Sequence, residues 1–194
     1  MLDSKKVTES KKRIEHALER GEMTKEKSGK FVSFFQENSQ RSFEAAQLLY
    51  NVSIQEEMKK VVGFPAFNGF LWVINASYYS MFYMARALRE KSGVKIKTDY
   101  SVHLLTFDAL VTYFYTTGKI EKQMLEEFHE ANIEVQDALG KEKARALMED
   151  YLSEREKRSR FTYEMGEIAL QNKAKTSLDR AKNFNEALRK MLET

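Results

Sequence analysis

Few side chains in this sequence could carry out acid–base chemistry. It contains three histidines, His16, His103 and His129, and no cysteine. Imidazole titrates near neutral pH, so a histidine could exchange protons with a ribose hydroxyl or a phosphate ester. The densest basic run, REKRSR, covers residues 155–160. A guanidinium in this run could stabilise negative charge on a phosphate.

The histidines do not indicate a metal site. Glu126-x-x-His129 has the spacing of di-iron helical bundles, but such bundles need a second copy of the motif, and the sequence has none. We therefore expect His129 on a solvated helix face and His16 on the surface. The sequence also lacks a glycine-rich phosphate loop and a zinc-ligand spacing. We predict no metal and no cofactor.

The elements that must position these residues are predicted to be helices. The 194-residue chain has one proline and abundant helix-forming residues, and 31% of its residues are charged. We expect an all-α protein of roughly seven helices without a strand ladder. Thr8 and Ser101 are the expected N-caps of two of them, and TSLD at residues 176–179 is read as a capping box that opens the last helix. Another helix is expected to begin near Thr24, and a further one to end at Gly140.

The segment 70–91, FLWVINASYYSMFYMARALREK, is apolar nearly all round and is predicted to lie in a helix that starts near Asn68 and stops at Gly93. A helix of this kind is buried on more than one side, so we expect it at the centre of the core. Its tyrosines and its tryptophan are also compatible with a dimer interface. Arg86 and Arg89 lie near its end and are expected to border a polar cleft.

The run ASYYSMFYMARALRE resembles the signature helix of the HEPN family, the higher-eukaryote and prokaryote nucleotide-binding domain. SFEAAQLLYN, KTDYSVHLLTFDAL, REKRSRFTYE and SLDRAKNFNEALRKML resemble further family segments in the same order. The resemblance covers residues 31–194 and leaves residues 1–30 as an N-terminal helical appendage. It implies an up-and-down helical bundle, often homodimeric, which in some cases pairs with a nucleotidyltransferase as a toxin–antitoxin system.

Many HEPN proteins are ribonucleases whose motif is an arginine, then four to six intervening residues, then a histidine. This sequence departs from that pattern, because Tyr163 stands where a histidine should follow Arg158. Tyrosine is a poor base near neutral pH. We therefore favour a non-catalytic or weakly catalytic dimeric module that binds RNA, a nucleotide or a partner nucleotidyltransferase. The alternative is a metal-independent RNA endonuclease that uses Arg158 with Tyr163 or His103. The expected binding residues are Arg155, Arg158, Arg86, Arg89, Tyr79 and His103.

The remaining sequence features suggest where the protein works. The N-terminal stretch has no apolar core of the kind found in signal peptides. The segment 70–91 is interrupted by polar residues, which makes it a poor membrane span. We expect a cytoplasmic protein without membrane attachment. The net charge of +3 does not by itself indicate nucleic acid.

Overall fold

The computed structural model describes residues 2–26, 29–97, 101–149 and 160–193; for Leu139, 141–149 and 160–167 the backbone alone is considered. Its elements, in chain order, are α1 (Ser4–Glu19), β1 (Met23–Lys25), α2 (Val32–Ile54), α3 (Glu56–Val61), α4 (Phe70–Lys91), β2 (Val94–Ile96), α5 (Val102–Leu110), the π-helical turn η1 (Val111–Tyr115), α6 (Lys122–Glu149) and α7 (Arg160–Glu193). The predicted all-α helical bundle is confirmed.

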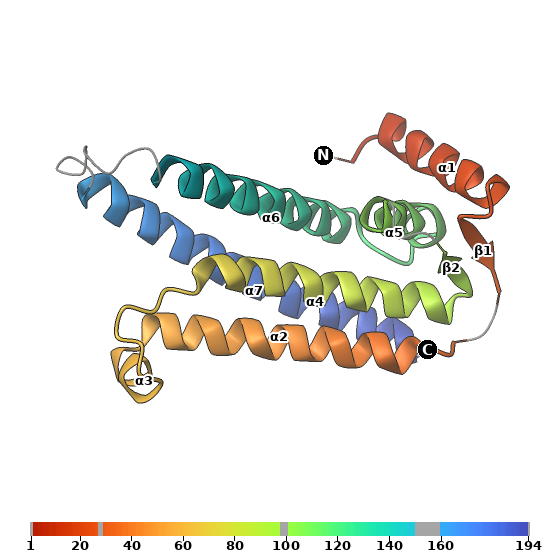
Figure 1. Ribbon diagram of the computed structural model, residues 1–194. Coiled ribbons are helices and arrows are strands. Elements are labelled where there is room, and N and C mark those ends of the chain that lie inside the picture. Colours follow the sequence, from red (N-terminus) through yellow and green to blue (C-terminus); the bar gives the residue numbers. More distant parts are fainter. Residues whose placement is uncertain (1, 27–28, 98–100, 150–159, 194) are drawn as a thin grey trace.

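Helix α4 lies at the centre of the bundle. Helix α2 runs beside it, α7 crosses behind the pair, and α5 and α6 lie along its other side (Figure 1). The α4 side chains Val73, Met81, Met84 and Ala85 are fully buried. The prediction that the segment 70–91 is the central core helix is therefore confirmed.

Small polar residues hold α2, α4 and α7 together at one point. The hydroxyl of Ser39 donates to the Ser80 carbonyl, and the hydroxyl of Ser80 donates to the Ser39 carbonyl, each over 2.8 Å. Asn185 of α7 donates its amide to the Ser80 oxygen at 2.7 Å. All three residues are buried, so these bonds satisfy groups that water cannot reach.

The structure corrects the expectation that the chain has no strand ladder. Strands β1 and β2 pair antiparallel, with Met23 opposite Ile96 and Lys25 opposite Val94. The expected helix that begins near Thr24 is therefore wrong at its start, because β1 occupies this region and α2 begins only at Val32. Each strand has three residues, which is too short to leave a clear alternation in the sequence.

Helix α1 packs against α5 and the ladder. Ile14 and Ala17 of α1 share a small core with Val94 and Leu105. Asp3, not the predicted Thr8, caps the helix: its side chain accepts from the Lys6 backbone N–H at 2.8 Å. Residues 1–30 were predicted to be an appendage, and the described part of them packs on the bundle, through this small core and through Leu2 in the main core.

The helices of the C-terminal half are longer than predicted. Helix α6 continues through Gly140, where the sequence suggested an end, and α7 continues through Thr176, where it suggested a start. The Thr176 hydroxyl donates back to the Asn172 carbonyl at 3.0 Å, as a threonine inside a helix does. Ser101, another expected N-cap, makes no side-chain capping bond and has a left-handed backbone, with φ of 60°.

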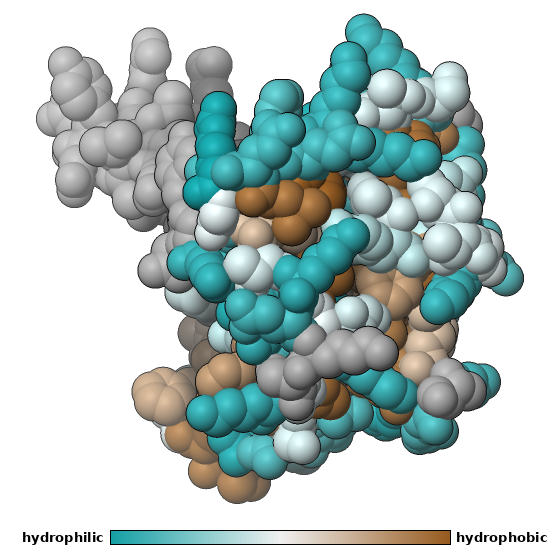
Figure 2. Space-filling view, turned by 90° about the vertical axis from the view of Figure 1, so that its right-hand side faces the viewer, coloured by the Kyte–Doolittle hydropathy of each residue, from teal (hydrophilic) through white to brown (hydrophobic). Residues whose placement is uncertain are grey.

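Hydrophilic side chains cover most of the end of the bundle at which α1 and the ladder lie, and hydrophobic ones show between them and at the lower edge (Figure 2). In the part of the chain that the structure describes, no helix combines the length and the apolar character needed to cross a membrane.

Candidate functional site

His103, in the first turn of α5, is surrounded by aromatic rings of α4. Its ring stacks on Phe82 with centroids 4.1 Å apart, and on Tyr78 at 5.6 Å. Tyr79 presents its ring edge at 5.9 Å. Tyr78 and Phe82 are four residues apart, so helix periodicity places both on the face that meets α5. The α4 rings cover one face of the imidazole, and part of the edge of the imidazole stays accessible.

A hydrogen bond fixes the orientation of this imidazole. The Tyr78 hydroxyl lies 2.7 Å from His103 Nδ1. Burial raises the pKa of Tyr78, so the phenol keeps its proton. No second partner for this hydroxyl is found among the described residues, so we assign it as the donor and Nδ1 as the acceptor. The neutral ring then carries its proton on Nε2, which is available to donate to a ligand.

His103 is kept neutral by its surroundings. Burial lowers its pKa, and the positive charge of Arg86 lowers it further. His129 of α6 also has a lowered pKa, first because of burial and second because of Lys6. Both imidazoles therefore act as uncharged hydrogen-bonding groups at neutral pH.

His103 and His129 line the same cavity, between α4, α5 and α6. It has a volume of about 410 Å³, which lies within the range of small-molecule sites. Its walls combine aromatic and aliphatic side chains with uncharged polar groups: Tyr78, Ser101, Val102, His103, Leu104, Phe107, Phe128, His129, Asn132, Ile133 and Gln136. No charged side chain is among these lining residues, so the cavity suits a neutral, flat, hydrogen-bonding group.

The predicted arginines of α4 have different surroundings. The Arg86 guanidinium lies over the rings of Phe35 and Phe82, at 4.3 and 5.6 Å from their centroids. It adjoins the His103 cluster without lining the cavity. Arg89 is buried, and its Nη1 donates to the Val94 carbonyl at 2.7 Å. Burial, with a contribution from Arg86, lowers the pKa of Arg89 to about 10. We therefore leave Arg89 out of the site proposed below.

The other predicted site residues divide into two groups. Tyr79 is 36% exposed beside His103, so it can contact a ligand at the edge of the cluster. Arg155 and Arg158 lie outside the described residues. Tyr163 lies in the helical backbone of α7, and its side chain is outside the description. The structure therefore brings Tyr79, Arg86 and His103 together.

Sequence reasoning missed the α6 wall of the cavity. His129 was assigned to a solvated face, but it is half-buried, and its ring lies 5.2 Å from that of Phe107. His129, Asn132 and Gln136 follow one another at helical spacings of three and four residues, which is the signal that could have grouped them.

Among the described residues, no group of three or more histidine or acidic side chains could hold a metal ion. Comparisons with protein-family models, with curated proteins and with solved structures find no match to this chain. The HEPN resemblance therefore stays a prediction.

Proposed function

We propose that the protein is an HEPN-like binding module whose cavity at His103 receives the base of a nucleotide or of single-stranded RNA. The observation that carries this proposal is the lining of the cavity, with stacked aromatic rings and uncharged hydrogen-bonding groups but no charged side chain. A nucleobase needs a flat apolar contact and complementary donors and acceptors at its edge. The Nε2–H of His103 and the amides of Asn132 and Gln136 supply them.

The same geometry argues for binding over catalysis at His103. A general base must offer an unprotonated nitrogen to the substrate. With Nδ1 occupied by Tyr78, the open nitrogen, Nε2, carries the proton and acts as a donor. The alternative is an RNA endonuclease that uses Arg158 with Tyr163 or His103. With His103 as the general base, this alternative would need His103 in its other tautomer.

Calorimetric titration with adenosine, cytidine, guanosine and uridine tests the proposal without any contribution from phosphate. We expect at least one nucleoside to bind at 1:1 stoichiometry. His103→Phe, which keeps a stacking ring and removes Nε2–H, should weaken it by about tenfold, because a lost hydrogen bond of about 1.4 kcal/mol has this effect. His16→Phe, at an exposed histidine of α1, is the matched control.

Two results would contradict the proposal. If the four nucleosides and a twelve-nucleotide single-stranded RNA all fail to bind, the cavity is not a base site. If the RNA is cleaved, and His103→Phe abolishes the cleavage while His16→Phe does not, the endonuclease alternative is correct. The RNA products should be resolved on a denaturing gel in the presence of a chelator.

We further propose that the module is a homodimer that joins through α4. Trp72, Ala76, Tyr79 and Tyr83 recur at helical spacing along one face of α4. Trp72 is 53% exposed and Tyr79 is 36% exposed, and Ala76 and Tyr83 are half-buried. In Figure 1 no described helix lies in front of the α2–α4 pair. Light scattering should give a dimer that Trp72→Glu converts to a monomer. Ile168→Glu, at a 56% exposed position of α7, should leave the dimer intact.

The resemblance also suggests a nucleotidyltransferase partner and a toxin–antitoxin role. Purification of the tagged protein from its own host cells, followed by mass spectrometry, tests this part of the proposal. Recovery of a nucleotidyltransferase in stoichiometric amount would support it, and recovery of the chain alone would contradict it.

A further inference from the structure

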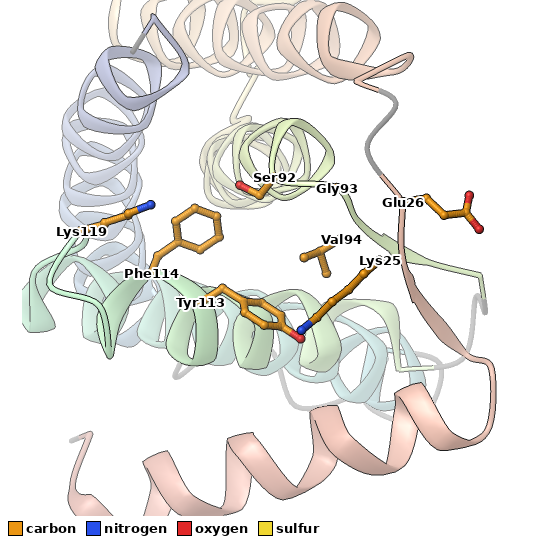
Figure 3. Close-up of a pocket in the computed structure, with 8 residues that line it drawn as sticks. All are labelled: Lys25, Glu26, Ser92, Gly93, Val94, Tyr113, Phe114 and Lys119. Atoms are coloured by element: carbon orange, nitrogen blue, oxygen red, sulfur yellow. The ribbon is translucent and has the colours of Figure 1, made fainter.

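A second cavity, separate from the one at His103, lies where the ladder meets the end of α4 and the turn η1. Its volume is about 430 Å³. Figure 3 shows the residues around it, which come from the end of β1, the α4–β2 connection, the start of β2, η1 and the turn that follows η1: Lys25, Glu26, Ser92, Gly93, Val94, Tyr113, Phe114 and Lys119.

Lys25, the last residue of β1, and Glu26, which follows the strand, direct their charged groups to different partners. Lys25 places its ammonium 4.9 Å from the centroid of the Tyr113 ring. The carboxylate of Glu26 points away from the cavity in Figure 3 and lies 3.4 Å from the ammonium of Lys95. The acidic neighbour is thus paired elsewhere.

The opposite wall is fixed by a tight turn after η1. Gly118 adopts φ of +71°, and the backbone N–H of Lys119 donates to the Phe114 carbonyl at 2.8 Å. The Lys119 ammonium points toward the Phe114 ring in Figure 3. η1 itself is a π-helical turn, an irregularity that is frequent at functional sites. It presents Tyr113 and Phe114 to the cavity as an aromatic wall.

The cavity therefore holds two cationic groups over an aromatic surface. Among the residues that the structure describes, no carboxylate forms an ion pair with Lys25 or Lys119. A lysine ammonium has three donors, so Lys25 can keep its contact with the ring of Tyr113 and still bind an anion. Two positive charges match the charge of a phosphomonoester dianion.

We propose that this cavity binds a small phosphomonoester, with the phosphate between Lys25 and Lys119 and the organic part against Tyr113 and Phe114. The size of the cavity limits the ligand to a metabolite. This site is distinct from the base site at His103, because the two cavities share no lining residue.

Calorimetry at low ionic strength with inorganic phosphate, glycerol 3-phosphate and succinate tests this proposal. We expect both phosphates to bind at 1:1 stoichiometry, the ester more tightly, and added salt to weaken them because the lysines are exposed. Backbone amide shifts at Gly93 and Lys119 should locate the ligand. None of these probes carries a nucleobase. If they do not bind, the proposed base site at His103 is therefore still tested separately by the nucleoside titration.

Charge-neutralising variants give the decisive comparison. Lys25→Gln and Lys119→Gln should each weaken phosphate binding about threefold, and the double variant about tenfold or more. Lys182→Gln, at an exposed lysine of α7, removes the same charge elsewhere and should change nothing. Equal effects of all three single variants, or tighter binding of succinate than of either phosphate, would overturn the proposal. Absence of binding of both phosphates would also overturn it.

Discussion

Replacement of Arg13 by methionine should release α1 from the bundle. The Arg13 guanidinium donates to both carboxylate oxygens of Asp108, at 2.7 and 2.8 Å. The Asp108 side chain is 0% exposed, whereas that of Arg13 is 39% exposed. Arg13→Met keeps the aliphatic part of the side chain and removes the charge, so Asp108 becomes a buried carboxylate without its counterion.

The expected magnitude follows from this difference in exposure. Removal of one partner of a buried ion pair costs about 3–5 kcal/mol, most of it the penalty of the charge left behind. Arg13 itself is 39% exposed, so water can approach Asp108 once the guanidinium is removed, and we expect the low end, about 3 kcal/mol. A free-energy loss of this size raises the population of detached α1 on the order of a hundredfold.

Amide hydrogen exchange of α1 measures this population directly, because α1 can open while the rest of the bundle stays folded. Protection at Ile14 and Ala17 should fall in Arg13→Met and recover in the double variant Arg13→Met/Asp108→Leu, which removes both charges. Arg41→Met breaks an exposed pair on α2 and serves as the control. Exchange in Arg13→Met within about twofold of the wild-type rate would refute this account of the ion pair.

Three further predictions follow from described contacts. Ser80→Ala should lower the free energy of unfolding in urea by about 2 kcal/mol, since it removes two buried hydrogen bonds, one to the Ser39 carbonyl and one from the Asn185 amide. A loss below about 0.5 kcal/mol would contradict this. Gly118→Ala should lower the free energy of unfolding by about 1 kcal/mol in the same assay, because its φ of +71° is unfavourable for a residue with a Cβ. The added Cβ would have no atom within 4 Å, so the loss would come from the backbone alone. Equal stability would argue against a left-handed turn. For His103, whose folded pKa is lowered by burial and by Arg86, the unfolded chain binds the proton first as the pH falls. The free energy of unfolding should therefore decrease below about pH 6.5, and the decrease should be less steep in His103→Phe. Titration of the His103 imidazole by NMR should give a pKa below the ordinary histidine value, and a pKa above that value would contradict this account.

The sequence specified the helices better than their connections. The predicted bounds of α4, near Asn68 and Gly93, differ by only two residues from the observed Phe70–Lys91. Its long run of apolar and helix-forming residues makes this prediction robust. Gly140 was read as a helix end, yet one glycine costs only about 1 kcal/mol, and α6 continues through it.

The site was accessible to sequence reasoning only in part. His103 and Tyr79 were among the expected binding residues, but Tyr78 was not, and its hydroxyl proves to be the partner of His103 Nδ1. That contact joins α4 to α5, and His129 contributes α6 as the third wall of the cavity. Sequence periodicity predicts which residues share one helix face, but not which faces of three helices meet.

The ladder also bears on how the chain reaches this fold. Lys95 and Glu26 are 69 residues apart in sequence, a long separation for two strands of three residues each. Helices α2 and α4 run antiparallel, however, so once this hairpin has formed, the ends that lead to β1 and β2 are already neighbours. The remaining loop to be closed is short, and its entropic cost is correspondingly small. The sequence separation of the two strands is therefore large, but the loop that remains to be closed after the hairpin has formed is short. We infer that β1 and α1 join the bundle after the α2–α4 hairpin and do not slow its folding.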